Sequence, residues 1–213
     1  MIKITVDNKQ FEVEEGANLL QVCLENDIYI PNLCYITDMA EPAAACRLCW
    51  VEIEGSAQPT PACTTTIDGP ITVKTDTPET RRLQKTALKL LLSVHHVDCK
   101  NCQANKKCDL QHLAKVLKVP LKTKDFELCL KEPEIDSTHP FLDYYPNRCV
   151  LCGKCLYVCQ NQNGQSMLSF AKRGIHTVIS AFGSQAVNTD ACITCQACAD
   201  ICPVGALALK TES

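Results

Sequence analysis

Apolar and polar positions alternate over residues 2–6, with Ile2, Ile4 and Val6 on one side of an extended segment. An Asp7-Asn8 pair, typical of tight turns, follows, and the alternation resumes at residues 11–13. This pattern predicts a β-hairpin.

Apolar positions then recur at helical spacing over residues 19–24. Residues 50–53 and 71–73 are short apolar segments that predict further strands. A hairpin, one helix and more strands together predict a β-grasp sheet crossed by a helix.

The middle of the chain changes to helical periodicity. Thr77 and Pro78 form a helix start, with Thr as the N-cap and Pro at the first helical position. The helix continues to Val94, and a second helix is predicted over residues 110–117. Residues 119–143 mix charged, Pro and scattered apolar positions, and we interpret them as a connector ordered by contact, with partner docking as a possible use.

The predicted fold class is therefore α+β, in four parts. A hairpin over residues 169–179 is expected in the last part. The expected boundaries are a β-grasp domain at 1–77, a helical segment at 78–118, the connector at 119–143 and a ferredoxin-like domain at 144–213.

Seventeen of the 213 residues are cysteine, a level typical of a cysteine-dependent scaffold. Two stretches, residues 149–159 and 192–202, both have the spacing C-x2-C-x2-C-x3-C. This is the bacterial two-cluster ferredoxin pattern, in which the fourth Cys of each stretch binds the other stretch's cluster. Structural zinc is the alternative for such a spacing. The expected [4Fe–4S] ligand sets are Cys149, Cys152, Cys155 and Cys202 for one cluster, and Cys159, Cys192, Cys195 and Cys198 for the other.

The β-grasp segment contains its own cysteine set, with spacing C-x11-C-x2-C-x13-C. The C-x2-C pair and the remote fourth Cys agree with plant-type [2Fe–2S] ferredoxins, although the first interval is longer here. Small residues in the loop 41–49 can bring backbone N–H groups close to the sulfurs and tune the potential. Zinc or a mixed scaffold is the alternative. The expected [2Fe–2S] ligands are Cys34, Cys46, Cys49 and Cys63.

The helical segment ends in a set of three cysteines, Cys99, Cys102 and Cys108. Three thiolates are one short of the four that a [4Fe–4S] cluster takes, so a fourth ligand is needed. His95, four residues before the first Cys at the end of the helix, is the first candidate, and the spacing leaves His96 as the alternative. An imidazole ligand should raise the potential relative to an all-Cys site.

Two cysteines stand apart from these sets. Cys23 lies on the apolar side of the predicted 19–24 helix and is expected to be a buried small hydrophobe. Cys129 lies in the connector and is expected not to bind metal. His112, His139 and His176 have no cysteines at ligand spacing, so structural or solvated roles are expected.

Composition and charge give no support to several classes of function. The net charge of −3, with basic residues that we expected to be dispersed, gives no reason to propose nucleic acid or an anionic membrane as a partner. The N-terminus lacks a signal-peptide core, and no apolar segment is long enough to span a membrane. Cytoplasmic localisation is therefore expected. The dispersed glycines form no G-x-G-x-x-G or P-loop, so FMN and NAD(P) are expected only on partner subunits.

The pattern H-x3-C-x2-C-x5-C, formed by His95, Cys99, Cys102 and Cys108, resembles the histidine-ligated cluster motif of the large iron–sulfur subunit of complex I. It also resembles the N-terminal region of many [FeFe] hydrogenases. The order of the three motif regions is similar to the small diaphorase subunit of NAD-linked nickel–iron hydrogenases and to the electron-input region of electron-bifurcating [FeFe] hydrogenases. The resemblance covers essentially the whole chain and implies that His95, rather than His96, is the ligand.

The resemblance implies a relay for single electrons rather than a catalytic subunit. The implied partners are a flavoprotein that binds FMN and NAD(P)H, a thioredoxin-like [2Fe–2S] subunit, and a catalytic oxidoreductase subunit, such as a hydrogenase or formate dehydrogenase, or a soluble ferredoxin. The similar hydrogenase and complex I chains continue into a further large domain, which we expect this chain to lack because it stops at Ser213. A free-standing multi-cluster ferredoxin and a zinc-bearing structural module are the alternative functions.

Overall fold

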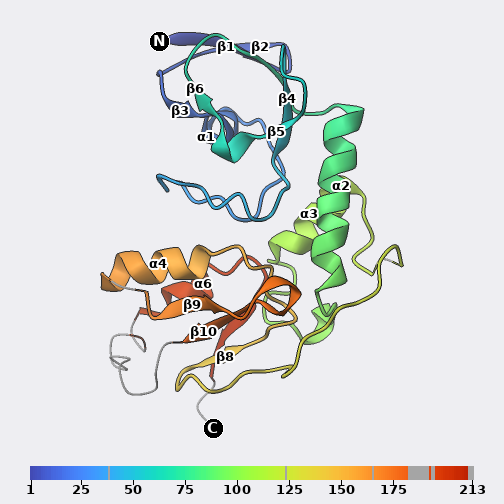
Figure 1. The fold of residues 1–213 in the computed structure, drawn as a ribbon, viewed down its shortest axis with the longest axis vertical. Helices are drawn as coiled ribbons and strands as arrows, with labels where there is room; N and C mark the ends of the chain where they lie inside the picture. The colour runs from blue at the N-terminus through green and yellow to red at the C-terminus, as the bar shows by residue number, and fades with distance from the viewer. Residues whose placement is uncertain (38, 123, 165, 182–191, 193–194, 211–213) are drawn as a thin grey trace.

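The computed structural model describes residues 1–37, 39–122, 124–164, 166–181, 192 and 195–210. The chain forms two lobes joined by a long helix, α2 (Pro78–Ser93), which runs along one side of the molecule (Figure 1). The N-terminal lobe contains most of the β-structure. The C-terminal lobe contains shorter elements that surround the two ferredoxin cysteine stretches.

The N-terminal lobe is a β-grasp sheet with strand order β2-β1-β7-β4-β5. β1 pairs antiparallel with β2, where Ile4 faces Phe11, and parallel with β7, where Thr5 faces Thr72. A separate small pair, β3 with β6, holds the start of α1. The bounds are β1 (Ile2–Val6), β2 (Lys9–Val13), β3 (Ala17–Asn18), α1 (Leu19–Glu25), β4 (Trp50–Ile53), β5 (Thr60–Pro61), η1 (Ala62–Thr64), β6 (Thr66–Ile67) and β7 (Thr72–Lys74).

Helix α2 begins with a capping box, in which Thr77 and Thr80 bond each other's backbone N–H groups. It is tied to the β-grasp because the Gln84 side chain donates to the Trp50 carbonyl at 3.2 Å. The short η2 (Cys99–Asn101) and then α3 (Asp109–Leu117) follow, and α3 packs against α2.

The C-terminal lobe contains two small antiparallel sheets, β8 with β11 and β9 with β10. β9 and β10 form the hairpin expected between the ferredoxin stretches, with η3 at its turn. The helices α4 and α6 carry ligand cysteines and contact each other. The bounds are β8 (Leu142–Tyr144), α4 (Lys154–Asn163), β9 (Leu168–Ala171), η3 (Gly174–His176), β10 (Val178–Ala181), α6 (Ala197–Asp200) and β11 (Leu207–Leu209).

Buried apolar side chains form two clusters rather than one. One lies inside the β-grasp sheet, around Leu19, Leu20 and Ile67. The other joins α2, α3 and the C-terminal lobe, around Leu88, Leu113 and other fully buried side chains. The expected hairpin, helices and β-grasp strands are confirmed, each within a few residues of its predicted ends.

Candidate iron–sulfur centres

The four cysteines of the β-grasp lobe come together at the boundary between the two apolar clusters. All four are buried, none more than 3% exposed. Cys34 and Cys46, whose sulfurs are 3.4 Å apart, belong to the apolar cluster that joins α2, α3 and the C-terminal lobe. Cys49 and Cys63 belong to the β-grasp cluster. The site therefore connects the two halves of the molecule.

The loop before Cys49 has the unusual backbone that such a site requires. Ala44 and Arg47 both have positive φ angles, 48° and 54°, a region that costs a side-chain-bearing residue about 1–2 kcal/mol. This backbone turns the N–H groups of Ala45 and Cys46 toward Cys34, where they lower the pKa of its thiol. The expected approach of backbone N–H groups to the sulfurs is confirmed.

The pKa values of the four β-grasp thiols are shifted in opposite directions. Contact with Cys46 lowers the pKa of Cys34 to about 6, and contact with Cys49 lowers that of Cys63. The same contacts, with burial, raise the pKa values of Cys46 and Cys49. Without a metal the four thiols therefore do not ionise alike, and the positive charge of bound iron would favour the thiolate form of all four.

The histidine-containing set lines one cavity below the end of α2. His95, Cys99, Cys102 and Cys108 all face it, together with Arg148 and other side chains. Cys99 and Cys102 are half-buried and Cys108 is buried. The imidazole of His95, the candidate fourth ligand, therefore lies in the same cavity as the three thiols.

His95 has the properties of a metal ligand. Its Nδ1 atom is buried and, among the described residues, has no hydrogen-bond partner. Burial lowers the pKa of the His95 imidazole to about 4, against the opposing effect of the Arg148 carbonyl, so the ring is neutral at physiological pH. A neutral imidazole with a free nitrogen is the form that binds metal.

His96 differs from its neighbour. It is exposed, and its Nδ1 lies 3.5 Å from a carboxylate oxygen of Glu134. Its backbone N–H donates to the Asn147 carbonyl at 2.7 Å. His96 also lines this cavity, but its imidazole has a polar neighbour and faces solvent.

The first ferredoxin set also shares one cavity. Cys149, Cys152 and Cys155 line it together with Cys202 from the second stretch, as the crossed pattern requires. The Leu151 N–H lies 3.4 Å from the Cys149 sulfur, and the Ala206 N–H lies 3.2 Å from the Cys202 sulfur. Such N–H groups stabilise negative charge on cluster sulfurs.

The second ferredoxin set is Cys159, Cys192, Cys195 and Cys198. Burial, together with the nearby thiols of the other three, raises the pKa of Cys198 to about 12. The Met167 N–H lies 3.2 Å from the Cys159 sulfur. The residues between Cys192 and Cys195 lie outside the described part of the chain.

Val204 is shared by the cavity of the histidine-containing set and the first ferredoxin cavity. Its side chain is 1% exposed and lines both cavities. The adjoining backbone is bonded across the junction, because the Asp109 N–H donates to the Pro203 carbonyl at 2.9 Å. A Cβ atom on Gly205 would lie only 2.7 Å from the Ala104 Cβ.

Sequence reasoning did not identify Val204 or Gly205. Both lie just after Cys202, the last cysteine of the second ferredoxin stretch. Their role follows from the packing of residues about 100 positions apart, and no local pattern indicates it.

The remaining thiols and imidazoles lie away from these sets. Cys23 is buried on α1, as expected, and burial raises the pKa of its thiol to about 12. Cys129 is exposed in the connector. His112 contacts the Tyr29 ring edge-on, and His139 is buried beside Phe141. His176 is exposed in η3.

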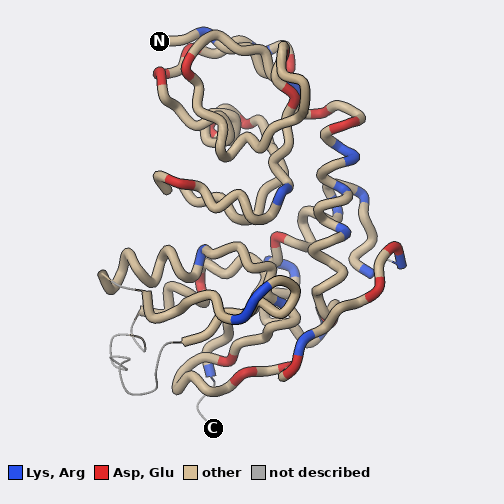
Figure 2. Tube along the Cα trace, in the orientation of Figure 1, with Lys and Arg blue, Asp and Glu red and all other residues tan. Residues whose placement is uncertain are grey.

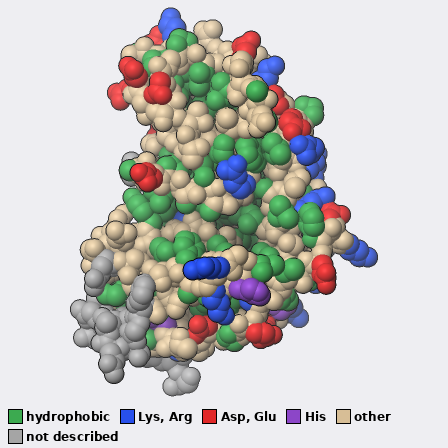
Figure 3. Space-filling model, in the orientation of Figure 1, with side chains coloured by type: hydrophobic (Ala, Val, Ile, Leu, Met, Phe, Trp, Pro, Cys, Tyr) green, Lys and Arg blue, Asp and Glu red, His purple; other side chains and the backbone are tan. Residues whose placement is uncertain are grey.

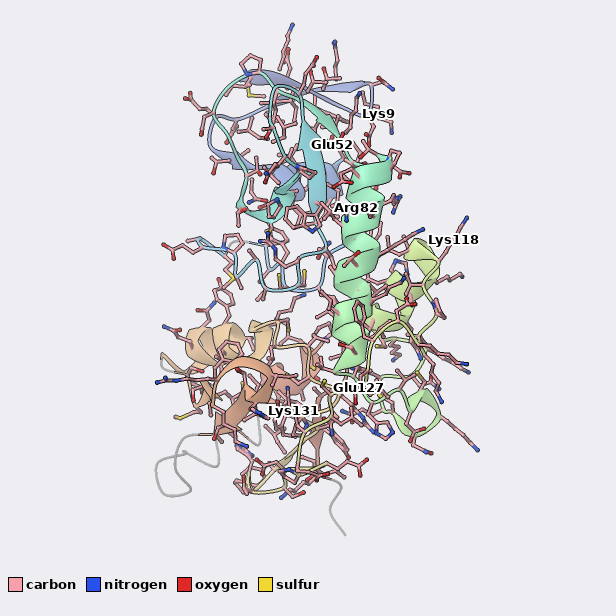
Figure 4. The ribbon with its side chains drawn as sticks, turned by 45° about the vertical axis from the view of Figure 1, so that its right-hand side comes forward. Lys9, Glu52, Arg82, Lys118, Glu127 and Lys131 are labelled. Carbon is pink, nitrogen blue, oxygen red and sulfur yellow. The ribbon has the colours of Figure 1, made fainter. Side chains whose placement is uncertain are left out.

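A large surface hollow lies elsewhere, between the β4–β5 turn and the start of α2. It is lined by Trp50, Glu52, Lys74 and neighbouring residues, and none of the expected ligands faces it. Figure 4 labels Glu52 on β4, and its carboxylate accepts from the Thr77 hydroxyl at 2.7 Å. The expected ligand thiols come together instead in the small cysteine-lined cavities and in the buried β-grasp set.

Two negative findings apply to the described residues only. No group of three or more His, Cys, Asp or Glu side chains among them is arranged to hold a single metal ion. No helix in this part of the chain is long and apolar enough to cross a membrane.

Three family models match the chain in succession. Residues 1–78 match a 2Fe-2S iron-sulfur cluster binding domain. Residues 84–120 match the NADH-ubiquinone oxidoreductase-G iron-sulfur binding region. Residues 139–208 match the ferredoxin-like domain of NADH-quinone oxidoreductase subunit 3.

Two curated relatives are similar over nearly the whole chain. An NADH-quinone oxidoreductase subunit of Rhizobium meliloti (strain 1021) is 33% identical over 97% of this chain, and NADPH-Fe(3+) oxidoreductase subunit alpha of Geobacter sulfurreducens (strain DL-1 / KN400) is 32% identical over 99%. The chain spans about a quarter of each relative's length, 24% in both cases.

A solved structure has the same fold. A chain of the NAD+-reducing [NiFe]-hydrogenase in its H2-reduced state matches with a TM-score of 0.86 and 28% identity, over 100% of this chain and 88% of that one. The α+β fold with these three modules is therefore confirmed.

These matches define the class: an iron–sulfur electron-transfer protein that binds 2Fe-2S and 4Fe-4S clusters. Over nearly its whole length the chain is similar to iron–sulfur subunits of complex I-type oxidoreductases and of an NAD+-reducing [NiFe]-hydrogenase.

Proposed function

We propose that the chain holds one [2Fe–2S] and three [4Fe–4S] clusters and passes single electrons within a multi-subunit NAD(P)H-linked oxidoreductase. The clusters supply reversible one-electron chemistry when bound. The proposed ligands are the four sets described above, with His95 as the one imidazole, and the proposed domain limits are 1–77, 78–118, 119–143 and 144–213.

One observation carries the proposal: the ligand sets adjoin one another through buried residues. Cys34, Cys46, Cys108 and Cys155 belong to the same apolar cluster. Val204 lines two neighbouring ligand cavities, and the nearby Cys198 raises the pKa of Cys155. A single cluster site would suffice to stabilise the fold. Several cluster sites that adjoin one another support a relay of single electrons.

The residues around each cysteine set would tune the reduction potential of its cluster. Backbone N–H groups at Leu151, Met167 and Ala206 face ligand sulfurs, which favours the negatively charged state. Burial of the β-grasp cysteines excludes water from that site, whereas the cysteines at 99 and 102 are more open. Different surroundings should give the clusters different potentials.

The proposed partners are those that the family resemblance implies. A flavoprotein that binds FMN and NAD(P)H would supply or take electrons at one end, with a thioredoxin-like [2Fe–2S] subunit beside it. A catalytic oxidoreductase subunit, such as a hydrogenase or formate dehydrogenase, or a soluble ferredoxin would serve the other end. The structural match to an NAD+-reducing [NiFe]-hydrogenase supports an NAD-linked complex.

The first test compares His95→Ala with His96→Ala in anaerobically purified protein. The parent should contain about 14 iron atoms and matching sulfide, from the cluster types proposed. His95→Ala should lose or alter one cubane signal in electron paramagnetic resonance and leave the ferredoxin pair intact. His96→Ala, which changes the exposed neighbour, should leave all signals in place.

Three unchanged cubane signals in His95→Ala would refute the ligand assignment. Zinc in place of iron would refute the relay. An anaerobic pull-down from native cells then tests the complex: a co-purified FMN protein and catalytic subunit support it, whereas recovery of the folded chain alone favours a free-standing ferredoxin.

A further inference from the structure

The connector carries five consecutive exposed residues, 126–130, that belong to no helix or strand. Phe126, Leu128 and Leu130 are 40%, 57% and 47% exposed. Large apolar side chains at three alternate positions are unusual on a free surface, and such patches mark interaction sites.

Hydrogen bonds fix one edge of this segment. The Cys129 N–H donates to the Ser93 carbonyl at the end of α2, at 2.9 Å. Two residues later, the Lys131 N–H donates to the Asn147 side chain at 2.7 Å, and the Asn147 amide donates back to the Lys131 carbonyl at 2.9 Å. Bonds at every second residue indicate an extended segment bonded to the protein along one edge.

The opposite edge is open. In an extended chain the backbone groups of successive residues point to opposite edges, so those of Leu128 and Leu130 point away from Ser93 and Asn147. Among the described residues, the backbone N–H and carbonyl groups of Phe126, Leu128 and Leu130 make no hydrogen bond within the chain. An exposed strand edge with apolar side chains is a template for pairing with another chain.

Basic residues predominate in the chain that leads to this segment. Contrary to our expectation of dispersed charge, 11 of the 21 Lys and Arg residues lie in residues 78–124, against 3 of the 24 Asp and Glu. They gather along α2 and around α3, whereas acidic residues predominate in the β-grasp lobe (Figure 2) and in residues 125–143. Lys118, labelled in Figure 4 at the end of α3, and Lys122 and Lys124 are exposed.

The segment is held against α2. A salt bridge of 2.5 Å joins Lys89 on α2 to Asp125, and Figure 4 labels Glu127 beside the lower end of this helix. Leu90, 52% exposed and three residues before Ser93 on the same helix face, extends the apolar surface. Apolar and basic side chains lie together along the edge of Figure 3 where Figure 1 places α2 and the connector.

We propose that residues 126–130 form a docking edge for an extended, acidic segment of a partner subunit. The partner's backbone would pair with Leu128 and Leu130, its apolar side chains would cover Phe126 and Leu128, and its carboxylates would face Lys122 and Lys124. A strand satisfies the open backbone groups, which a lipid surface would leave unpaired. This inference rests on the proposed function, because it requires a partner subunit.

The test uses the complex purified anaerobically from native cells and the isolated chain as its reference. Amide hydrogen exchange at residues 126–130 should slow at least about tenfold in the complex. Carbodiimide, which couples lysine to carboxylates directly, should link Lys122 or Lys124 to acidic residues of a partner subunit.

Matched variants test the apolar contact. Phe126→Ser/Leu128→Ser should raise the dissociation constant of the complex about tenfold or more, as for central apolar contacts. The control Phe170→Ser/Ile175→Ser removes side chains of similar exposure, 48% and 52%, from the β9–β10 hairpin. It should change the dissociation constant of the complex less than about twofold. The iron content of both variants should equal that of the parent.

Three outcomes would overturn the docking edge while leaving the relay in place. The first is unchanged amide exchange at residues 126–130 in a complex that forms, and the second is cross-links only to another copy of this chain. The third is binding of the isolated chain to phosphatidylserine vesicles, if Phe126→Ser/Leu128→Ser abolishes that binding. A chain recovered alone, with its full iron content, would overturn both the complex and the docking edge.

Discussion

The β-grasp lobe and the C-terminal lobe both surround cysteine sets, but they differ in what fills their interiors. The β-grasp has a five-stranded sheet and side chains such as Leu19, Leu20 and Val6 that are completely buried. In the described part of the C-terminal lobe the sheets are two-stranded, and most of the cysteines proposed as ligands are half-buried.

This difference separates two ways of stabilising an iron–sulfur site. In the β-grasp, an apolar core exists apart from the ligands and holds the cysteine loop in place. The C-terminal lobe shares its apolar cluster with α2 and α3, and most of its cysteines are half-buried around it, so we expect metal binding and folding to be coupled there. Bound clusters should therefore contribute more to the stability of the C-terminal lobe than to that of the β-grasp.

Removal of iron gives the largest expected effect and tests this comparison directly. With an anaerobic chelator and reductant, amide exchange in β8–β11 and α4 should accelerate by roughly a thousandfold, equivalent to about 4 kcal/mol. Exchange in β1, β2 and α1 should change by less than about tenfold. Equal acceleration in both lobes, measured by mass spectrometry, would show that the β-grasp core is not independent.

An intermediate effect is expected at the junction between the C-terminal lobe and the histidine-containing set. Gly205→Ala should destabilise the protein by about 2–4 kcal/mol, because the new methyl group meets Ala104 in addition to the strain of a positive φ. Gly174→Ala has similar strain but open space around it, so about 1 kcal/mol is expected.

The measurement is the thermal unfolding midpoint, together with the magnetic interaction between the two adjoining clusters. Gly205→Ala should lower the midpoint by several degrees more than Gly174→Ala and weaken that interaction. Equal shifts for the two variants would mean that close packing at Ala104 does not hold the junction together.

The smallest effect is expected outside both lobes. Cys129→Ser should leave the iron and sulfide content unchanged and alter stability by less than about 0.5 kcal/mol, because the side chain is exposed. Loss of iron on elemental analysis would show that the connector contributes a ligand and would remove the distinction between connector and lobes.

Local patterns predicted the individual elements well. Thr77-Pro78 marked the start of α2, and the alternation over residues 2–13 marked the first hairpin. These succeeded because capping, turn formation and alternation depend on neighbouring residues alone. The expectation of dispersed basic residues was wrong, because residues 78–124 contain 11 of the 21 Lys and Arg, and this distribution is already present in the sequence.

The sequence by itself determined the cysteine sets, the order of the three modules and the presence of a histidine before Cys99, because metal-ligand spacing is a local property. Only the tertiary structure decided that the Nδ1 atom of His95 is buried without a hydrogen-bond partner among the described residues, while His96 faces solvent. It alone placed Val204 between two cavities and left Leu128 and Leu130 on an open edge. These features depend on which distant segments pack together, and long-range packing leaves no periodic trace along the chain.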